Sequence, residues 1–168
     1  RTEGAVTPEH FAQAMAETAL EWSEEERRGF AQVLPQLQRF LAPMRWKAPS
    51  TILLVKTSDR LMDGFPHTRA NAIVLPEGML RDALAKPALM DYLMVHEAFH
   101  VLTRADSQLR EELYAAIGFR GCASTDLPAA LAEQRITNPD EPEKRYAIRL
   151  ARGEVMPFVH FASENIDA

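Results

Sequence analysis

Residues 87–104 read P-A-L-M-D-Y-L-M-V-H-E-A-F-H-V-L-T-R, and we expect the rest of the fold to be built around this stretch. It starts with proline and contains no glycine and no later proline, which is typical of an uninterrupted helix. Its apolar residues wrap most of the helix surface, and this pattern predicts a buried helix. The apolar positions are Leu89, Met90, Leu93, Met94, Val95, Phe99, Val101 and Leu102.

Three polar residues interrupt the most apolar part of this helix. His96 and His100 are four residues apart, which places two imidazoles on one face with Cβ atoms about 5–6 Å apart. Two imidazoles in this arrangement can hold one Zn²⁺, while Glu97 lies beside the metal without binding it. Buried helices carry such residues when they are paired or metal-bound, so the H-E-x-x-H pattern predicts a metal centre. Hydrogen-bonded core histidines are the alternative.

The composition is that of an ordinary globular domain. The 168 residues are 46% hydrophobic and 26% charged, which argues against disorder. A net charge of −5 offers no basic stripe, so we expect no nucleic-acid partner. No apolar run approaches the roughly 20 residues that span a bilayer, so we expect a soluble protein without a transmembrane segment. The single cysteine, Cys122, excludes an intrachain disulfide.

The chain starts at Arg1 without a methionine. We therefore expect either a processed product or a piece of a longer protein. Removal of a signal peptide on secretion, or on export to a periplasm, would produce such a start, and the compartment stays open.

The first part of the chain, residues 1–45, predicts a helical cover. Residues 8–22 form an amphipathic pattern that begins with a threonine N-cap and a proline. The S-E-E-E run at 23–26 is a capping box that opens a second helix to about residue 42. Pro35 is expected to kink or split this second helix.

The rest of the chain predicts an α+β, helix-rich fold, and we expect one domain over residues 1–168. Its core, residues 50–118, has strands at 51–57 and 72–75, a helix at 77–85, the histidine-bearing helix, and a helix at 107–118. Residues 119–168 add a short helix at 127–135, a turn-rich loop at 137–142 and a hairpin around Arg152-Gly153.

A catalytic zinc site needs three protein ligands and one open position. If the chain reverses after residue 103, residues 108–113 lie opposite the two histidines. At about 100° per residue, Glu112 borders the apolar face of its helix and Glu111 points nearly opposite. Glu112 is therefore the first choice for the third ligand, and a surface carboxylate paired with an arginine is an equal alternative. Candidates to support the histidines from outside are Asp91, Asn138 and Asp140.

Asp106 is the main competitor for the third position. It lies six residues after His100, the spacing of the metzincin pattern H-E-x-x-H-x-x-G-x-x-H/D. Thr103 stands where that pattern has glycine, whose backbone freedom allows the sharp turn. Asp106 is also a natural N-cap for the next helix, and this is the preferred interpretation. More distant candidates are Glu133, Glu143 and His160.

Together these residues resemble the zincin metallopeptidases, and more closely their gluzincin branch, in which a later glutamate completes the zinc site. N-A-I-V-L-P at 71–76 is similar to the N-A-x-x-L-P edge strand that precedes H-E-x-x-H in prenyl-protease-type gluzincins. In zincins such a strand pairs with an extended substrate. The resemblance covers roughly residues 71–117. This chain departs from the pattern in having Glu77 in place of glycine, no membrane helices, and a shorter separation to Glu112.

The resemblance implies a zincin-like fold and zinc-dependent hydrolysis of peptide bonds in a peptide or protein substrate. Zinc lowers the pKa of its bound water towards about 7, and Glu97 would take the proton and pass it to the leaving amine. The strand residues implied to contact substrate are Asn71, Ala72 and Ile73. Tyr146 and His160, together with Tyr114, are candidates to stabilise the developing oxyanion.

Two other interpretations stay open. The first is a catalytically inactive zincin-like module that binds metal or regulates a partner. The intact Glu97 argues against it, because a pure metal-binding scaffold has no use for a glutamate at that position. The second is a helical domain without metal, in which the H-E-x-x-H pattern is a coincidence.

Overall fold

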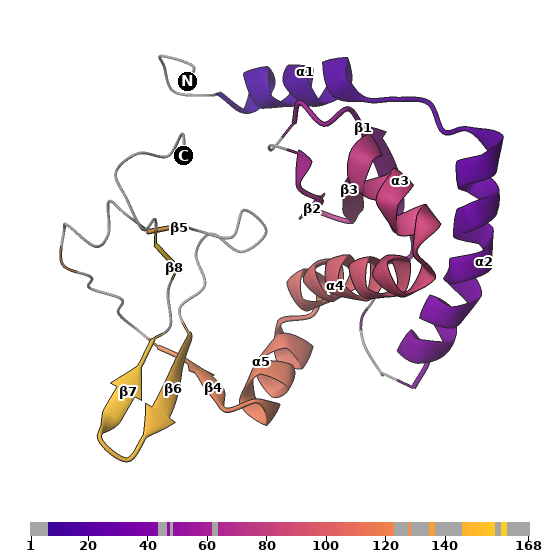
Figure 1. Ribbon diagram of the computed structural model, residues 1–168. Helices are drawn as coiled ribbons and strands as arrows, with labels where there is room; N and C mark the ends of the chain where they lie inside the picture. Colours follow the sequence, from indigo (N-terminus) through magenta and orange to yellow (C-terminus); the bar gives the residue numbers. More distant parts are fainter. Residues whose placement is uncertain are drawn as a thin grey trace. The chain divides into compact units, whose positions relative to one another are not determined.

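The computed structural model describes residues 7–43, 47, 49–61, 64–122, 128, 135–136, 146–156 and 159–160. The chain divides into two compact units, residues 1–105 and 106–168, and each is described by itself (Figure 1). Helices and short strands occur together, which confirms the α+β class. The boundary between the units falls inside the predicted core 50–118, and the prediction of one domain over the whole chain stays a prediction.

The first helix, α1 (Pro8–Thr18), begins as predicted and ends earlier than predicted. The Thr7 side chain accepts a hydrogen bond of 3.3 Å from the amide of His10, which makes Thr7 the N-cap. The helix stops before residue 19 because the following residues pair with a strand. Ala19 forms a β-bridge with Thr57, and the amide of Leu20 donates to the Lys56 carbonyl at 2.9 Å.

The second helix, α2 (Glu24–Leu41), is continuous through Pro35, so the expected split does not occur. Its capping box is present: the amide of Glu26 donates to the Ser23 hydroxyl, and the Glu26 carboxylate accepts from the Ser23 amide. Phe30 anchors α2 in the core, where its ring meets that of Trp22 edge-on at 5.2 Å. Packing of the α2 face that carries Phe30 offsets the loss of the backbone hydrogen bond that proline cannot make.

Strands β1 (Leu53–Thr57), β2 (His67–Arg69) and β3 (Ala72–Pro76) form a sheet in the order β1-β3-β2. Strand β1 is parallel to β3, and β2 is antiparallel to it. The prediction that β3 is an edge strand is therefore wrong. Its continuous apolar run is what a strand buried on both faces requires, and such strands belong in the middle of a sheet. Strand β2 was not predicted, because H-T-R is short and polar.

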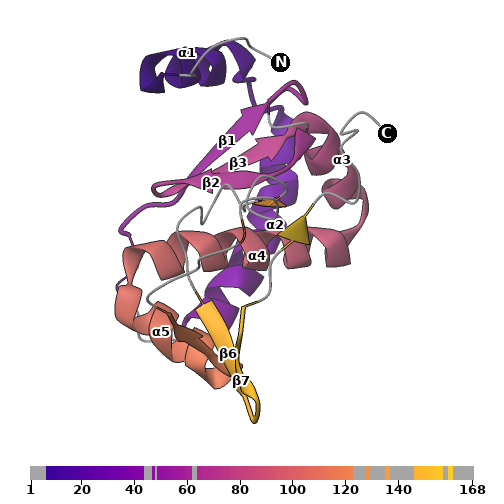
Figure 2. The same cartoon turned by 90° about the vertical axis from the view of Figure 1, so that its left-hand side faces the viewer.

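Helices α3 (Glu77–Ala85) and α4 (Pro87–Ala105) complete the first unit and begin and end close to the predicted positions. Helix α4 contacts α2, α3, β2 and β3, and the views in Figures 1 and 2 show the sheet on one side of it with α2 passing alongside. The buried hydrophobic cluster joins α2, β3, α3 and α4, and its members are Phe30, Ile73, Leu75, Leu80, Ala83, Met90, Leu93, Met94 and Val101. The predicted buried helix is confirmed.

Arg104 ties the end of α4 to the turn between β2 and β3. One of its guanidinium nitrogens donates to the Ala70 carbonyl at 3.0 Å, and the other donates to the Thr68 hydroxyl at 2.7 Å. Ala70 has a φ of 49°, a left-handed conformation that costs a non-glycine residue about 1 kcal/mol. The two bonds from Arg104 therefore hold a turn that is unfavourable by itself.

The second unit starts with α5 (Ser107–Ala116), which contacts β4 (Phe119–Gly121). Strands β4, β6 (Tyr146–Leu150) and β7 (Gly153–Val155) form an antiparallel sheet in that order, and β5 (Arg135–Ile136) pairs with β8 (Val159–His160). The predicted hairpin is confirmed as β6–β7, although its second strand is shorter than expected. Of the short helix predicted at 127–135, residues 127 and 129–134 lie outside the described residues, and Arg135 belongs to β5 instead. The predicted loop at 137–142 also lies outside the described residues. None of the described helices is long and apolar enough to cross a membrane.

Glu26 also joins α2 to the first sheet. Its Oε1 lies 2.8 Å from Lys56 Nζ on β1, and both side chains are more than four-fifths buried. Burial alone raises the pKa of Glu26, but the hydrogen bonds from Lys56 and from the Ser23 amide outweigh this effect, so the pKa lies below its usual 4.5. The carboxylate therefore stabilises the fold above pH 4.5, and this contribution is lost as the pH falls through the lowered pKa.

We predict that Glu26→Gln lowers the free energy of unfolding by about 1 kcal/mol at pH 7, since it removes the ion pair with Lys56 and weakens the capping box. Urea unfolding at pH 7 and at pH 3 should show that the difference from the wild type shrinks at the lower pH. The matched control is Glu24→Gln, an exposed substitution in the same first turn that should change stability little. An equal loss at both pH values would contradict the role of the carboxylate.

Candidate metal centre

The two motif histidines lie side by side on α4. Their Nε2 atoms are 3.2 Å apart, and their ring centroids are 4.8 Å apart with an interplanar angle of 79°. Two nitrogens bound to one tetrahedral zinc ion at about 2.0–2.1 Å would be separated by about 3.3 Å. The spacing of His96 and His100 therefore fits two ligands of one metal ion. It also fits a hydrogen bond from a protonated Nε2 to an unprotonated one.

The three motif residues differ in burial. His96 is exposed, His100 is 7% exposed, and Glu97 is 2% exposed. The Oε2 atom of Glu97 and the Nδ1 atom of His100 are buried. The centre thus opens to solvent at His96, while its carboxylate lies in a region of low dielectric, where electrostatic interactions are stronger than in water.

Two exposed aromatic residues flank the histidines. The Tyr92 ring lies 5.8 Å from that of His96, and the Phe99 ring lies 6.1 Å from that of His100. Tyr92 is 66% exposed and Phe99 is 37% exposed. Tyr92 was not predicted as a site residue, although its position four residues before His96 places both on one face of the helix.

The first unit supplies two imidazoles and one glutamate to this centre. Within the described part of the chain, no group of three or more His, Cys, Asp or Glu side chains could hold a metal ion. The predicted third ligand, Glu112, lies on α5 in the second unit, where it is exposed and accepts a 3.0 Å hydrogen bond from Gln108. Its role as a ligand stays a prediction.

Glu111 and Tyr146 are joined in the second unit. The Tyr146 hydroxyl donates to Glu111 at 2.7 Å and accepts from Arg110 Nε at 3.0 Å, while the Tyr146 ring stacks on Tyr114 with centroids 4.3 Å apart. Burial raises the pKa of Tyr146, the hydrogen bond to Glu111 raises it further, and Arg110 partly offsets this. The one hydroxyl proton of Tyr146 is directed at Glu111, which favours a structural role over the stabilisation of an oxyanion.

Asp106 caps α5, as the preferred interpretation predicted. Its Oδ1 atom accepts hydrogen bonds of 3.1 Å from the amides of both Gln108 and Leu109. Helix α4 runs through Thr103, whose hydroxyl donates to the Phe99 carbonyl at 2.8 Å. The sharp turn that the metzincin pattern places at this position is therefore not formed.

The residues expected to bind substrate on β3 are engaged within the sheet. Ala72 pairs with Leu53 on one side and with Arg69 on the other, and Ile73 is 1% exposed. Asn71 donates from its side chain to the Thr51 carbonyl at 2.9 Å. Because β3 is central, its backbone is not available for pairing with an extended peptide, and the basis for that prediction is lost. Among the described strands of this sheet, β1 and β2 hold the two edge positions.

The remaining candidates are distributed over both units. His160 lies on β8 opposite Arg135, and its proposed role stays a prediction. Asp91 lies on α4 and borders a groove between α2 and α4. Four candidates lie outside the described residues, namely Glu133, Asn138, Asp140 and Glu143.

Comparisons of this chain with protein-family models, with curated proteins and with solved structures find no match.

Proposed function

We propose that this chain is a zinc-dependent peptidase with a zincin-like fold, in which His96 and His100 hold the metal. One observation carries the proposal: the two Nε2 atoms lie 3.2 Å apart, and the buried Glu97 stands between these residues on the same helix. A hydrogen-bonded histidine pair alone would not need a carboxylate at this position, whereas a metal-bound water needs a general base beside it.

The chemistry would be divided between the metal and Glu97. When bound, Zn²⁺ would polarise the scissile carbonyl and lower the pKa of a water molecule. The Glu97 carboxylate would accept a proton from the attacking water and donate it to the leaving amine nitrogen. Its burial excludes most bulk water, so few other proton acceptors compete at this position.

The two imidazoles are carried by a packed helix and not by a loop. His96 and His100 project from a helix whose opposite side is fixed in the core by residues such as Met94 and Val101, each 1% exposed. Sites built on packed helices hold their geometry more closely than sites built on loops. In this proposal Glu112 supplies the third ligand, since Glu111 is held by Tyr146 and Arg110 and Asp106 caps α5.

Metal analysis tests the proposed ligands. We expect protein purified without added zinc to contain about one equivalent, and we expect His96→Ala and His100→Ala each to lose most of it, since each removes one direct ligand. The matched control is His10→Ala, which changes an exposed histidine on α1 and should leave the zinc content unchanged. Less than half an equivalent in the wild type, or full zinc in both variants, would contradict a metal centre.

Digestion of a peptide library tests Glu97. The Glu97→Gln variant should keep its zinc and lose at least about 100-fold in cleavage rate, because the amide cannot accept the proton. Glu77→Gln, an exposed change on α3, is the control for the loss of one negative charge. Equal cleavage by Glu97→Gln and wild type would remove Glu97 as the base. A wild type that binds zinc and cleaves nothing would instead favour the inactive module.

The third ligand is tested by a pair of adjacent substitutions. Glu112→Gln should weaken zinc binding at least about tenfold in a competition with a fluorescent chelator, since it removes a charged ligand. Glu111→Gln should leave zinc binding unchanged, although it disturbs the bonds to Tyr146 and Arg110. Weaker zinc binding by Glu111→Gln and not by Glu112→Gln would assign the third-ligand position to Glu111. Weaker zinc binding by Asp106→Asn alone would assign it to Asp106.

A further inference from the structure

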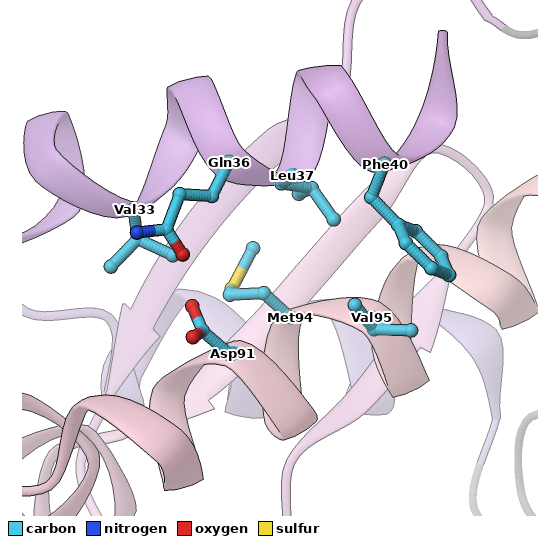
Figure 3. A pocket seen from close by; sticks show the side chains of 7 residues that line it. All are labelled: Val33, Gln36, Leu37, Phe40, Asp91, Met94 and Val95. Atoms are coloured by element: carbon cyan, nitrogen blue, oxygen red, sulfur yellow. The ribbon is translucent and has the colours of Figure 1, made fainter. Parts of the chain in front are cut away.

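A groove between α2 and α4 has a volume of about 200 Å³ (Figure 3). Most of its wall is apolar, and these residues are Val33, Leu37, Phe40, Met94 and Val95. Two polar side chains, Gln36 and Asp91, also border it, and Figure 3 shows them at one end with the Phe40 ring at the other. Pockets for small molecules usually measure about 300–1,000 Å³, so this groove has the size for a single side chain.

Asp91 is the unusual member of this set. It is half-buried, and within the described part of the chain it makes neither a hydrogen bond nor an ion pair. A carboxylate beside apolar side chains costs free energy unless a donor or a cation satisfies it. A second hollow of about 170 Å³ also borders Val33, Gln36 and Asp91, so the carboxylate lies where two hollows meet and can be reached from outside.

We propose that this groove binds the side chain of a lysine or an arginine from a peptide. The alkyl stem would lie against the apolar wall, and the cationic head would donate hydrogen bonds to Asp91 and to the side-chain oxygen of Gln36. Among the described residues that border the groove, Asp91 is the one that carries a charge. Charge complementarity therefore selects a basic side chain over a purely apolar one of the same length.

The groove and the histidine pair share one helix. Val95 borders the groove and precedes His96 directly, and Asp91 lies five residues before His96. Five residues correspond to a rise of about 7.5 Å and a rotation of about 140°. An extended peptide would span this separation in about three or four residues. The assignment of the groove as a substrate subsite rests on the proposed function. The binding of a basic side chain in the groove does not depend on it.

Binding is tested by NMR of the metal-free protein with ¹³C-labelled methionine methyl groups, since Met94 lines the groove. The probes are the Nα-acetyl amides of arginine, lysine, norleucine and phenylalanine. We expect the arginine and lysine probes to shift the Met94 signal with saturation, and the norleucine probe to bind about tenfold more weakly, since it lacks a bond to a charged group. Asp91→Asn should remove this preference. The control Asp82→Asn, an exposed carboxylate on α3, should keep it.

Several results would overturn the groove assignment: no shift of the Met94 signal at millimolar probe, equal binding of norleucine, or tighter binding of phenylalanine. A preference that survives Asp91→Asn in a variant that still unfolds like the wild type would also overturn it. Because the NMR binding experiment involves neither zinc nor cleavage, its results are independent of the proposed function.

In the library digestion, the wild type should enrich Lys or Arg at one position near the scissile bond, and Asp91→Asn should not. Cleavage without such enrichment would overturn the subsite alone.

Discussion

The burial of α4 is the constraint on which the first unit depends. This helix packs against the β1-β3-β2 sheet, α2 and α3, and its residues Met90, Met94 and Val101 are almost completely removed from water. Full burial of one such side chain stabilises a fold by about 1.5–3 kcal/mol. Because several are buried around the helix, α4 cannot rotate without exposing them. The spacing and direction of His96 and His100 follow from that restriction.

The sequence predicted best those features that depend on neighbouring residues. The N-cap at Thr7, the capping box at Ser23 and the start of α4 at Pro87 are local signals, and the structure confirms all three. The place of a strand within a sheet depends on distant partners. Strand β2 was missed because His67 and Thr68 are buried polar residues, with the Thr68 hydroxyl bonded to Arg104. The central place of β3 was already indicated by its unbroken apolar run.

The features of the candidate site also divide into local ones and ones that depend on distant residues. The histidine pair and Glu97 are separated by at most four residues on one helix, so their arrangement follows from helix geometry. The proposed ligation by Glu112 would depend on long-range contacts that no local pattern encodes. Tyr146 shows why: its hydroxyl is engaged by Glu111 and Arg110, which lie 35 and 36 residues away in the sequence. Helix geometry also separates Asp91 from the histidines, since five residues correspond to a rotation of about 140° and place it on another flank of α4.

The two hydrogen bonds from Arg104 connect the end of α4 to the hairpin of β2 and β3. Arg104 lies four residues after His100, and its guanidinium holds both the Thr68 side chain on β2 and the Ala70 carbonyl in the next turn. The position of strand β2 and the position of the last turn of α4 are therefore linked through Arg104. The hairpin formed by β2 and β3 is therefore fastened to the end of the histidine-bearing helix by a side chain one helical turn beyond His100.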